Sequence, residues 1–328
     1  MSDWVLLGDI GGTSARFGLL APNSETIDII DAAKLPNDKF NNFTDALGAF
    51  LKTITAVPAH ILLAVAGPIK DGTVKLTNRD WSISERVLKD EFGFKSVSLV
   101  NDFAAMARAV PELDGDRFDE VKAGEKDGSA PVLIAGPGTG LGMATLLPGA
   151  QGGWRVLGGE GGHAAFSPRT KEDVGIGEIL HSQHGFVSYE LVTSGMGLEP
   201  VHRAMCQLYK NDYIPMTANE VVKAANSGDE ICERICMLRA RAVMSFAGDM
   251  ALAIGARGGV TLAGGVATRL LPWLKQDEAM ECFMDRGPRS AYMSKIPVGL
   301  MRGDFIPLIG AAALYYDGVG KQGACSAT

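Results

Sequence analysis

Two stretches of the chain share one pattern of apolar positions. Residues 5–20 and 132–147 each contain an apolar run, a short turn rich in glycine and a second apolar run. Short apolar runs bounded by turn residues are typical of buried strands, so each stretch predicts two strands joined by a glycine turn. The familiar phosphate loops run from a strand into a helix, but a turn between two strands can also present backbone N–H groups to phosphate. The repeat therefore predicts two lobes that each hold part of one nucleotide.

The remaining pattern predicts an α/β protein of two domains. In the first lobe, apolar runs and amphipathic stretches alternate, which implies a mixed sheet with helices on its faces. Residues 111–128 are charged, contain glycine and lack a clear period, so we place the domain boundary there. Beyond residue 158 the pattern is mainly helical. The predicted strands are 26–33, 60–66, 72–76, 96–100 and 260–263, and the predicted helices are 43–54, 84–92, 103–110, 173–183, 188–194, 197–208, 218–227, 230–255 and 307–316.

Length and charge narrow the class of protein. The chain has 328 residues, enough for two domains, and a formal net charge of -7 without a basic stripe, so no nucleic acid partner is expected. The sequence predicts neither a signal peptide nor a membrane span, and we expect a cytoplasmic protein. An acidic protein must bind an anionic nucleotide locally, through backbone N–H groups, a metal ion or a few basic side chains.

The cysteine pattern argues against a structural zinc site. The five cysteines are scattered, odd in number and not arranged as Cys-x-x-Cys pairs. Cys232 and Cys236 lie one turn apart in a predicted helix, where buried packing is the favoured interpretation. A structural zinc site needs partnering Cys or His residues that this spacing does not supply, and the usage fits a reducing compartment.

Asp9 precedes the first glycine turn and is a candidate metal ligand. A carboxylate there can reach Mg²⁺ directly or through water, while Gly11, Gly12 and the Thr13 hydroxyl meet phosphate. The alternative is a plain hairpin turn. The second turn, Gly136-Pro-Gly-Thr-Gly-Leu-Gly142, has more glycine than a connection requires. Its spacing does not match a dinucleotide fingerprint, so a phosphate-binding hairpin is favoured over that interpretation.

Three further groups of polar residues are candidates for chemistry. Asn101-Asp102 stands where a predicted strand meets a predicted helix, which suits a general base for an alcohol but also an N-cap, the better interpretation of the pair taken alone. Glu160 and His163 lie in Gly158-Gly-Glu-Gly-Gly-His163, where the glycines would allow close approach to a ligand such as a polyol. The alternatives are a surface turn or a metal site that lacks an obvious third ligand. Glu190 starts a predicted helix, where a carboxylate can simply interact with the helix dipole.

Together these motifs resemble the bacterial glucokinase family of the non-ROK type, within the hexokinase, actin and Hsp70-like ATPase superfamily. The resemblance covers nearly the whole chain. The cysteine-rich zinc motif typical of ROK sugar kinases is absent, as is the DNA-binding helix pair of ROK repressors. The motifs, in the family's order, are Gly8-Asp-Ile-Gly-Gly-Thr13, Leu76-Thr-Asn-Arg-Asp-Trp81, Val100-Asn-Asp-Phe103, Gly136-Pro-Gly-Thr-Gly-Leu-Gly142, Gly159-Glu-Gly-Gly-His163 and Leu262-Ala-Gly-Gly-Val266.

The resemblance implies a two-lobed actin-like ATPase fold of the ribonuclease H-like type, each lobe a mixed sheet with flanking helices, and a cleft between the lobes. It implies transfer of the γ-phosphoryl group of ATP to the 6-hydroxyl of glucose, with Asp102 as general base, Mg²⁺ as cofactor, a role in glycolysis and a homodimer. The sugar hydroxyls would be held by Asn101, Asp102, Glu160, His163 and Glu190. The nucleotide would be held by Gly8, Asp9, Ile10, Gly11, Gly12, Thr13, Gly138, Thr139, Gly140, Gly264 and Gly265.

The boundary within residues 111–128 and the family's last helix, which crosses back to the first lobe, together give the expected domain limits. Residues 1–113 would form a small α/β domain to which a C-terminal helix at about 306–320 returns, and residues 114–305 a large α/β domain. The tail Lys321–Thr328 is expected to be disordered and has no assigned role.

Two alternatives stay open. One is a kinase of another hexose or an amino sugar, such as mannose or glucosamine, and the other is an actin-like ATPase that does not act on sugar. Asn101-Asp102 together with Glu160 and His163 favours a sugar acceptor, because a pure ATPase has no need of that cluster.

Overall fold

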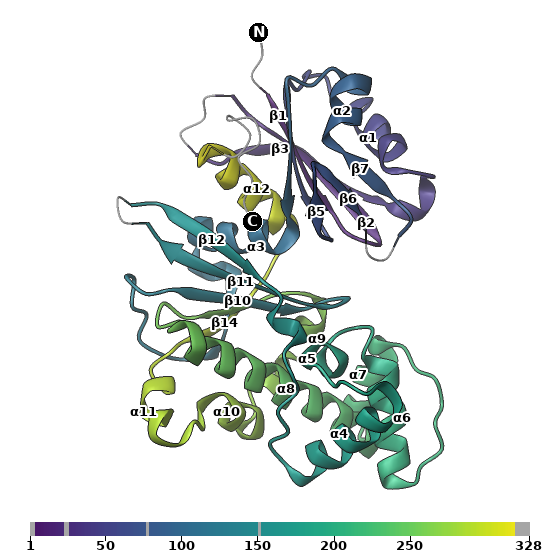
Figure 1. Cartoon of the computed structure of the whole chain (residues 1–328), viewed down its shortest axis with the longest axis vertical. Coiled ribbons are helices and arrows are strands. Elements are labelled where there is room, and N and C mark those ends of the chain that lie inside the picture. Colours follow the sequence, from purple (N-terminus) through teal and green to yellow (C-terminus); the bar gives the residue numbers. More distant parts are fainter. Residues whose placement is uncertain (1–3, 23–25, 77–78, 150–151, 319–328) are drawn as a thin grey trace. The chain divides into compact units, whose positions relative to one another are not determined.

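The computed structural model describes residues 4–22, 26–76, 79–149 and 152–318 of the chain (Figure 1). The tail Lys321–Thr328 and residues 77–78 of one sequence motif lie outside the described residues. The chain divides into two compact units, and each is described by itself. The first comprises Met1–Asp114, Gly153–Gly158 and Gly303–Thr328, and the second Gly115–Gly152 and Gly159–Arg302.

The first unit is built on a five-stranded mixed sheet in the order β3-β2-β1-β4-β8. β1 runs antiparallel to β2 and parallel to β4, which in turn is parallel to β8. Every residue of β1 is buried, as in a strand covered on both faces. The strands are β1 (Val5–Ile10), β2 (Ser14–Leu20), β3 (Ile29–Pro36), β4 (His60–Val65) and β8 (Ser96–Asn101); β5 (Ile69–Lys70), β6 (Thr73–Lys75) and β7 (Ser82–Ser84) form a small separate sheet.

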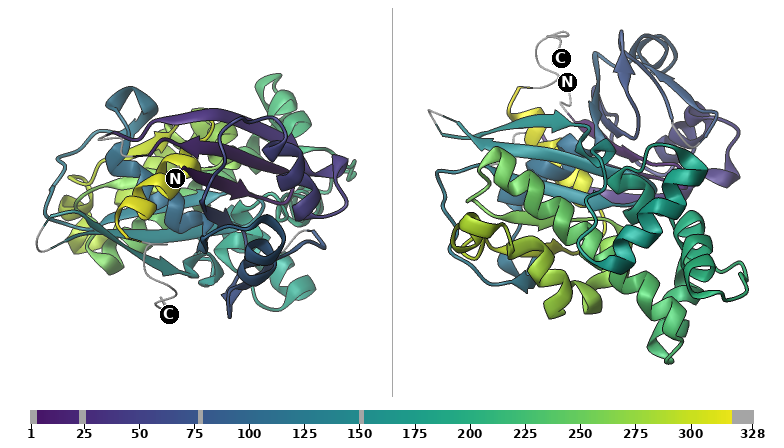
Figure 2. Two further views of the ribbon diagram at one scale, coloured as in Figure 1. Left: turned by 90° about the horizontal axis from the view of Figure 1, so that it is seen from above. Right: turned by 60° about the horizontal axis from the view of Figure 1, so that its bottom comes forward.

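Helices cover both faces of the first sheet, because successive apolar side chains of β1 point to opposite faces and both faces must be buried. Leu6 belongs to a core cluster that also contains side chains of α1 (Phe43–Leu51) and α2 (Glu85–Phe92). Leu7 belongs to a second cluster that contains side chains of α3 (Asp102–Ala109) and α12 (Ile306–Tyr316). The last helix of the chain, yellow in Figure 2, therefore packs beside the first strand, in purple.

The second unit repeats the plan of the first. The sheet that contains its strands has the order β12-β11-β10-β13-β14-β9, and residues 154–158 of the edge strand β12 are counted with the first unit. β10 forms an antiparallel hairpin with β11 and a parallel pair with β13, as β1 does with β2 and β4. The strands are β9 (Phe118–Lys122), β10 (Val132–Pro137), β11 (Leu141–Pro148), β12 (Trp154–Gly159), β13 (Val260–Leu262) and β14 (Val298–Met301).

The long helix α8 (Glu230–Ile254) is the centre of the second unit. It lies against the sheet, its middle part is almost wholly buried, and other helices surround it (Figures 1 and 2). No helix of the described part of the chain is long and apolar enough to span a membrane. The other helices are α4 (Lys171–His184), α5 (Tyr189–Thr193), α6 (Leu198–Tyr209), α7 (Ala218–Asn226), α9 (Gly265–Leu274), α10 (Asp277–Met284) and α11 (Ser290–Met293), with short 3-10 turns η1 (Asn37–Lys39), η2 (Val110–Glu112), η3 (Gly115–Arg117), η4 (Gly161–His163) and η5 (Gly287–Arg289).

Both glycine hairpins and the α/β class predicted from the sequence are confirmed, and so is the burial of Cys232 and Cys236. The sequence analysis assigned no strand to residues 111–128, but β9 lies within them. β9 is an edge strand with three charged residues in five, and such a strand lacks a clear apolar pattern. β3 also begins at Ile29 and extends to Pro36, three residues later at each end than predicted.

The packing of α12 on α3 can be tested at one glycine. A Cβ on Gly310 would collide with the backbone of Ala105, whereas a Cβ on Gly48 in α1 would meet nothing within 4 Å. We expect Gly310→Ala to destabilise the protein by about 1–3 kcal/mol through overpacking. Gly48→Ala is the control and should stabilise it by about 0.4–1 kcal/mol, because alanine has less backbone entropy to lose. Urea unfolding measures both, and equal effects would contradict the close contact between α12 and α3.

Candidate functional site

The first glycine turn, Gly11-Gly12-Thr13, has two of its three carbonyl groups occupied from outside the turn. The backbone N–H of Asn37 donates to Thr13 O at 3.0 Å, and the Asn37 amide Nδ2 donates to Gly11 O at 2.9 Å. Gly11 N donates to Ser14 O. Within the described residues, the N–H groups of Gly12 and Thr13 have no acceptor. A turn with two carbonyls held and two N–H groups left over can bind an anion such as phosphate.

Asp9 lies two residues before this turn and is only 6% exposed. Burial raises the pKa of its carboxyl group, and the Arg16 guanidinium, 2.8 Å away, opposes that shift. The sequence analysis missed Arg16, although the hairpin register pairs residues 9 and 16 directly opposite one another. No group of three potential metal ligands occurs among the described residues. One carboxylate suits a Mg²⁺ ion that arrives on nucleotide phosphates and keeps its waters, rather than an all-protein metal cage.

Asn101 and Asp102 lie at the same edge of the sheet as the first turn. Ile10, Val65 and Asn101 are register partners across the parallel strands β1, β4 and β8. At the usual strand spacing, Asn101 is about 10 Å from Ile10 across the sheet. Ligands of open α/β sheets bind at this carboxyl edge. The structure therefore brings Asp102 to the edge that carries the first glycine turn.

Asn101 is the N-cap of α3, so the capping interpretation of this residue is confirmed. Its Oδ1 accepts hydrogen bonds from the N–H groups of Phe103 and Ala104, at 2.9 and 3.2 Å. The half-buried Asp102 also accepts from Phe103 N, at 2.9 Å. These bonds fix the backbone at the start of the helix and thereby the position of both side chains.

The second glycine turn, Gly138-Thr139-Gly140, is held in the same way as the first. Gly195 N donates to Gly138 O at 2.8 Å, and Met196 N donates to Thr139 O at 3.2 Å. Gly138 N is used within the turn, where it donates to Gly140 O. In the described part of the chain, the N–H groups of Thr139 and Gly140 lack an acceptor. Each hairpin thus offers two N–H groups from its turn.

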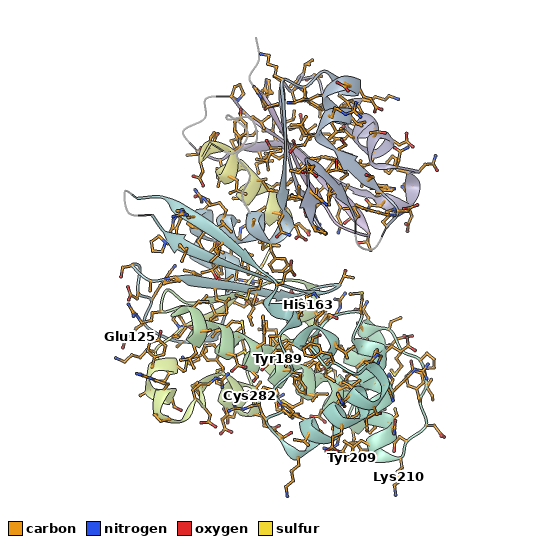
Figure 3. All side chains as sticks on the ribbon, viewed as in Figure 1. Glu125, His163, Tyr189, Tyr209, Lys210 and Cys282 are labelled. Atoms are coloured by element: carbon orange, nitrogen blue, oxygen red, sulfur yellow. The ribbon has the colours of Figure 1, made fainter. Side chains whose placement is uncertain are left out.

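Glu190 connects the second turn to His163. Its Oε2 accepts a hydrogen bond from Leu141 N at 2.7 Å, and its Oε1 lies 3.9 Å from His163 Nδ1. The neighbouring Tyr189, labelled with His163 in Figure 3, anchors α5 by donating its hydroxyl to Asp249 at 2.6 Å. Burial raises the pKa of Tyr189 to about 12. The carboxylate of Glu190 therefore has specific partners on β11 and η4 beyond its place in the first turn of a helix.

Glu160 and His163 are exposed on the turn that contains η4. We expected the glycines around them to allow close approach to a ligand. Gly161 and Gly162 instead approach β11, where a Cβ would collide with Met143 and with the backbone of Leu141, respectively. These glycines serve the packing of the turn on the sheet. They leave Glu160 and His163 facing solvent, three residues apart.

Gly264 and Gly265 lie beside the second turn. β13 runs parallel to β10, and Ala263 N donates to Ala135 O. Gly264 has a φ of 93°, and a Cβ on it would come within 2.7 Å of Pro137 O, so only glycine fits there. Since α9 begins at Gly265, the positive end of its helix dipole is next to a turn with free N–H groups, an arrangement that favours anions.

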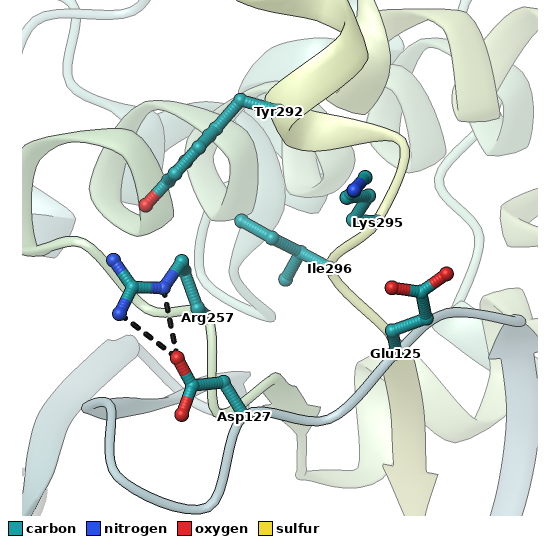
Figure 4. A pocket seen from close by; sticks show the side chains of 6 residues that line it. All are labelled: Glu125, Asp127, Arg257, Tyr292, Lys295 and Ile296. Atoms are coloured by element: carbon teal, nitrogen blue, oxygen red, sulfur yellow. Dashed lines mark hydrogen bonds and ion pairs between the residues drawn. The ribbon is translucent and has the colours of Figure 1, made fainter.

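A pocket of about 190 Å³ lies at the other edge of the second sheet (Figure 4). Its residues precede β10, β13 and β14, so they are at the amino ends of these strands. Figure 3 shows one of them, Glu125, well away from His163. Because the second glycine turn follows β10, at the opposite end of that strand, the pocket is separate from this turn. Within the pocket, Arg257 and Asp127 neutralise each other as an ion pair at 2.8 Å. The pocket is lined by Glu125, Asp127, Arg257, Tyr292, Lys295 and Ile296.

The structure thus groups the predicted site residues by unit. In the first unit, the segment Gly8–Thr13 and Asn101-Asp102 share one sheet edge. In the second, Glu190, His163, the second turn and Gly264-Gly265 are neighbours. Sequence reasoning missed the residues that hold the turns, because they come from distant segments. These are Asn37, Gly195 and Met196.

Comparison with known proteins agrees with this arrangement. The sequence model of the Glucokinase family matches residues 6–317. The glucokinase of Chromohalobacter salexigens is 39% identical over 93% of this chain and 95% of its own length. A solved glucokinase from an Antarctic psychrotroph is 36% identical, with a TM-score of 0.85 over 97% of this chain and 100% of its own. The glucokinase of Balamuthia mandrillaris, solved in complex with glucose, has the same fold, with 21% identity and a TM-score of 0.81 over 97% and 94% of the two chains.

The Asp9–Arg16 pair predicts a pH-dependent loss of stability in Arg16→Met. Without the guanidinium, the pKa of the buried Asp9 rises further, and the ionised carboxylate becomes the costly form. We expect a loss of about 3 kcal/mol at pH 7, which shrinks as the pH falls and Asp9 takes up a proton. Urea unfolding at pH 7 and pH 5 measures the loss. The double variant Asp9→Asn/Arg16→Met should recover part of it, and a loss that is the same at both pH values would contradict this account.

Proposed function

Because the chain belongs to the glucokinase family, we propose that it transfers the γ-phosphoryl group of ATP to the 6-hydroxyl of glucose, giving glucose 6-phosphate and ADP. The observation that carries the proposal is a contact within the second unit. Glu190 connects the second glycine turn, a candidate phosphate site, with His163, which together with Glu160 is a candidate sugar site. Glu190 accepts a hydrogen bond from Leu141 at the end of the turn and faces His163 with its other oxygen. An ATPase that does not act on sugar has no use for that connection.

Asp102 is the general base of the proposed reaction. Its carboxylate takes the proton of the 6-hydroxyl as that oxygen forms a bond to the γ-phosphorus, and the bond to the leaving ADP breaks. Asn101, Glu160, His163 and Glu190 hold the sugar hydroxyls together with Asp102. Charged and amide acceptors suit this task, because a sugar lacking one hydroxyl would leave a buried polar group unpaired. The chemistry is thus divided between the two units, which we take as the small and the large domain.

Phosphoryl transfer depends on positioning and charge neutralisation more than on covalent chemistry. The N–H groups of Gly12, Thr13, Thr139 and Gly140 supply the first contacts to the phosphates, and the start of α9 at Gly264-Gly265 lies near the adenosine. Gly8, Ile10, Gly11 and Gly138 shape the two turns. Asp9 would hold Mg²⁺ through water, and the ion would neutralise phosphate charge. A cytoplasmic homodimer active in glycolysis completes the proposal.

Release of ADP with and without sugar tests the proposal. We expect the rate of ADP release, followed in a coupled dehydrogenase assay, to depend on glucose. Mannose and glucosamine are the matched acceptors, and a preference for either would favour the alternative hexose or amino sugar kinase. ADP release that is the same in the presence and absence of every sugar would contradict a kinase and favour a simple ATPase.

Asp102→Ala tests the base. We expect kcat to fall by about 10²–10⁴, since a positioned base contributes a factor of that size, while glucose still binds. Asp102→Asn keeps a side chain of the same shape and should show the same loss. Calorimetry with glucose and steady-state kinetics separate binding from turnover. Near-normal turnover in either variant would remove Asp102 as the base.

Glu160→Gln tests the sugar contact. A neutral amide accepts a weaker hydrogen bond than a carboxylate, so we expect the KM for glucose to rise about tenfold, with a smaller change in the KM for ATP. Glu199→Gln on α6 is the control, because Glu199 is exposed and bonds only Arg203 of its own helix among the described residues. An unchanged KM for glucose in Glu160→Gln would return Glu160 to the role of a surface turn residue.

A further inference from the structure

Two arginines of α8 are buried in different ways. Arg241 has three carboxylate partners, Asp173 at 2.6 Å, Glu172 at 2.7 Å and Glu278 at 3.1 Å. Arg239, two residues earlier in the same helix, is 4% exposed and forms no ion pair with any described residue. Its positive charge is therefore not balanced within the described part of the protein.

Arg239 makes only backbone contacts among the described residues. One terminal nitrogen, Nη2, donates to Thr193 O at 2.7 Å and to Ser194 O at 2.6 Å. Its Nε is buried without an acceptor. Two other arginines also leave Nε without an acceptor, but each has a carboxylate partner: Asp9 for Arg16 and Asp249 for Arg286.

An unbalanced buried charge is unfavourable, so its retention needs a reason. Burial lowers the pKa of Arg239 to about 10, and the positive charge of Arg269 acts in the same direction. The side chain is still protonated at neutral pH. Arg269 itself is exposed, donates to Asn219 and to Gly265 O, and likewise has no ion-pair partner among the described residues.

The contacts of Arg239 lead directly to the second glycine turn. The carbonyls of Thr193 and Ser194 are drawn toward α8, and the next two N–H groups, of Gly195 and Met196, donate to Gly138 O and Thr139 O. By holding the carbonyls of residues 193 and 194, the guanidinium therefore also fixes the N–H groups of residues 195 and 196. These N–H groups in turn keep the carbonyls of the second glycine turn pointing away from an approaching anion.

We propose that Arg239 is a positioning residue that keeps the second glycine turn ready for the nucleotide phosphates, and that these phosphates balance its buried charge. The inference rests on the proposed function, since it takes residues 138–140 to be a phosphate site. In a protein with a net charge of -7, a buried cation behind this turn, with Arg269 beside it, supplies local positive charge that backbone N–H groups alone do not. Low-dielectric surroundings make that charge act more strongly than an exposed lysine would.

Substitutions at Arg239 separate this role from simple structural support. We expect Arg239→Met to raise the KM for ATP and the dissociation constant of ADP about tenfold or more, with the KM for glucose within about twofold of the wild type. Arg239→Lys keeps the charge and should stay within about threefold of the wild type for ATP. The control is Arg241→Met, which should lower the melting temperature and leave both KM values near those of the wild type.

Other results would contradict the positioning role of Arg239. An unchanged KM for ATP in Arg239→Met, or equal increases for ATP and glucose, would show a structural role only. If Arg239→Met does not fold, Arg239→Gln carries the same prediction, and failure of both to fold would also assign Arg239 to structure alone. A wild type that releases no ADP with glucose contradicts the proposed function, and calorimetric binding of ATP to the wild type and variants then tests the inference separately.

Discussion

A glycine turn binds phosphate only when its carbonyl oxygens are kept away from the anion, and much of this protein is arranged around that constraint. Backbone carbonyls repel phosphate, so each turn needs donors from elsewhere that occupy them. Asn37 does this for the first turn and residues 195–196 for the second. The two hairpins are thus similar in sequence and in strand pairing, and each depends on an unrelated segment for its chemistry.

The two glycine turns differ in the charges of the groups that hold them. The first turn is held by a neutral amide that is fully buried, and the nearby charge of Asp9 is matched by Arg16. The second is held by backbone donors, which are fixed by a cation that has no carboxylate partner among the described residues. The first turn therefore has one charge of each sign beside it, whereas near the second turn Arg239 and Arg269 outnumber the single carboxylate of Glu190. Such an asymmetry suits a ligand whose negative charge lies mainly at one end.

The sequence pattern predicts those features that depend on residues close together in the chain. Apolar runs gave the two hairpins, and the turn length would have given the Asp9–Arg16 pair as well. The contacts that complete each site join residues far apart in the chain, such as Leu141 with Glu190, and no single-sequence pattern encodes them. β9 escaped prediction because an edge strand can be charged without cost to the core. The packing of Gly161 and Gly162 on β11 was not predicted, because close packing on a strand and close approach to a ligand require the same residue type.

The return of α12 to the first unit has a consequence for how the protein is made. Leu308, Ala311 and Ala312 complete the core cluster that contains Val5 and Leu7, and Arg108 pairs with Asp317. On the ribosome, β1 must therefore wait for residues 306–316 before the core on its second face is complete. The second unit, by contrast, is fully synthesised before α12 emerges. The order of synthesis is thus the reverse of the order in which the two cores can be completed, so β1 and its neighbouring strands need protection from aggregation until α12 has been made.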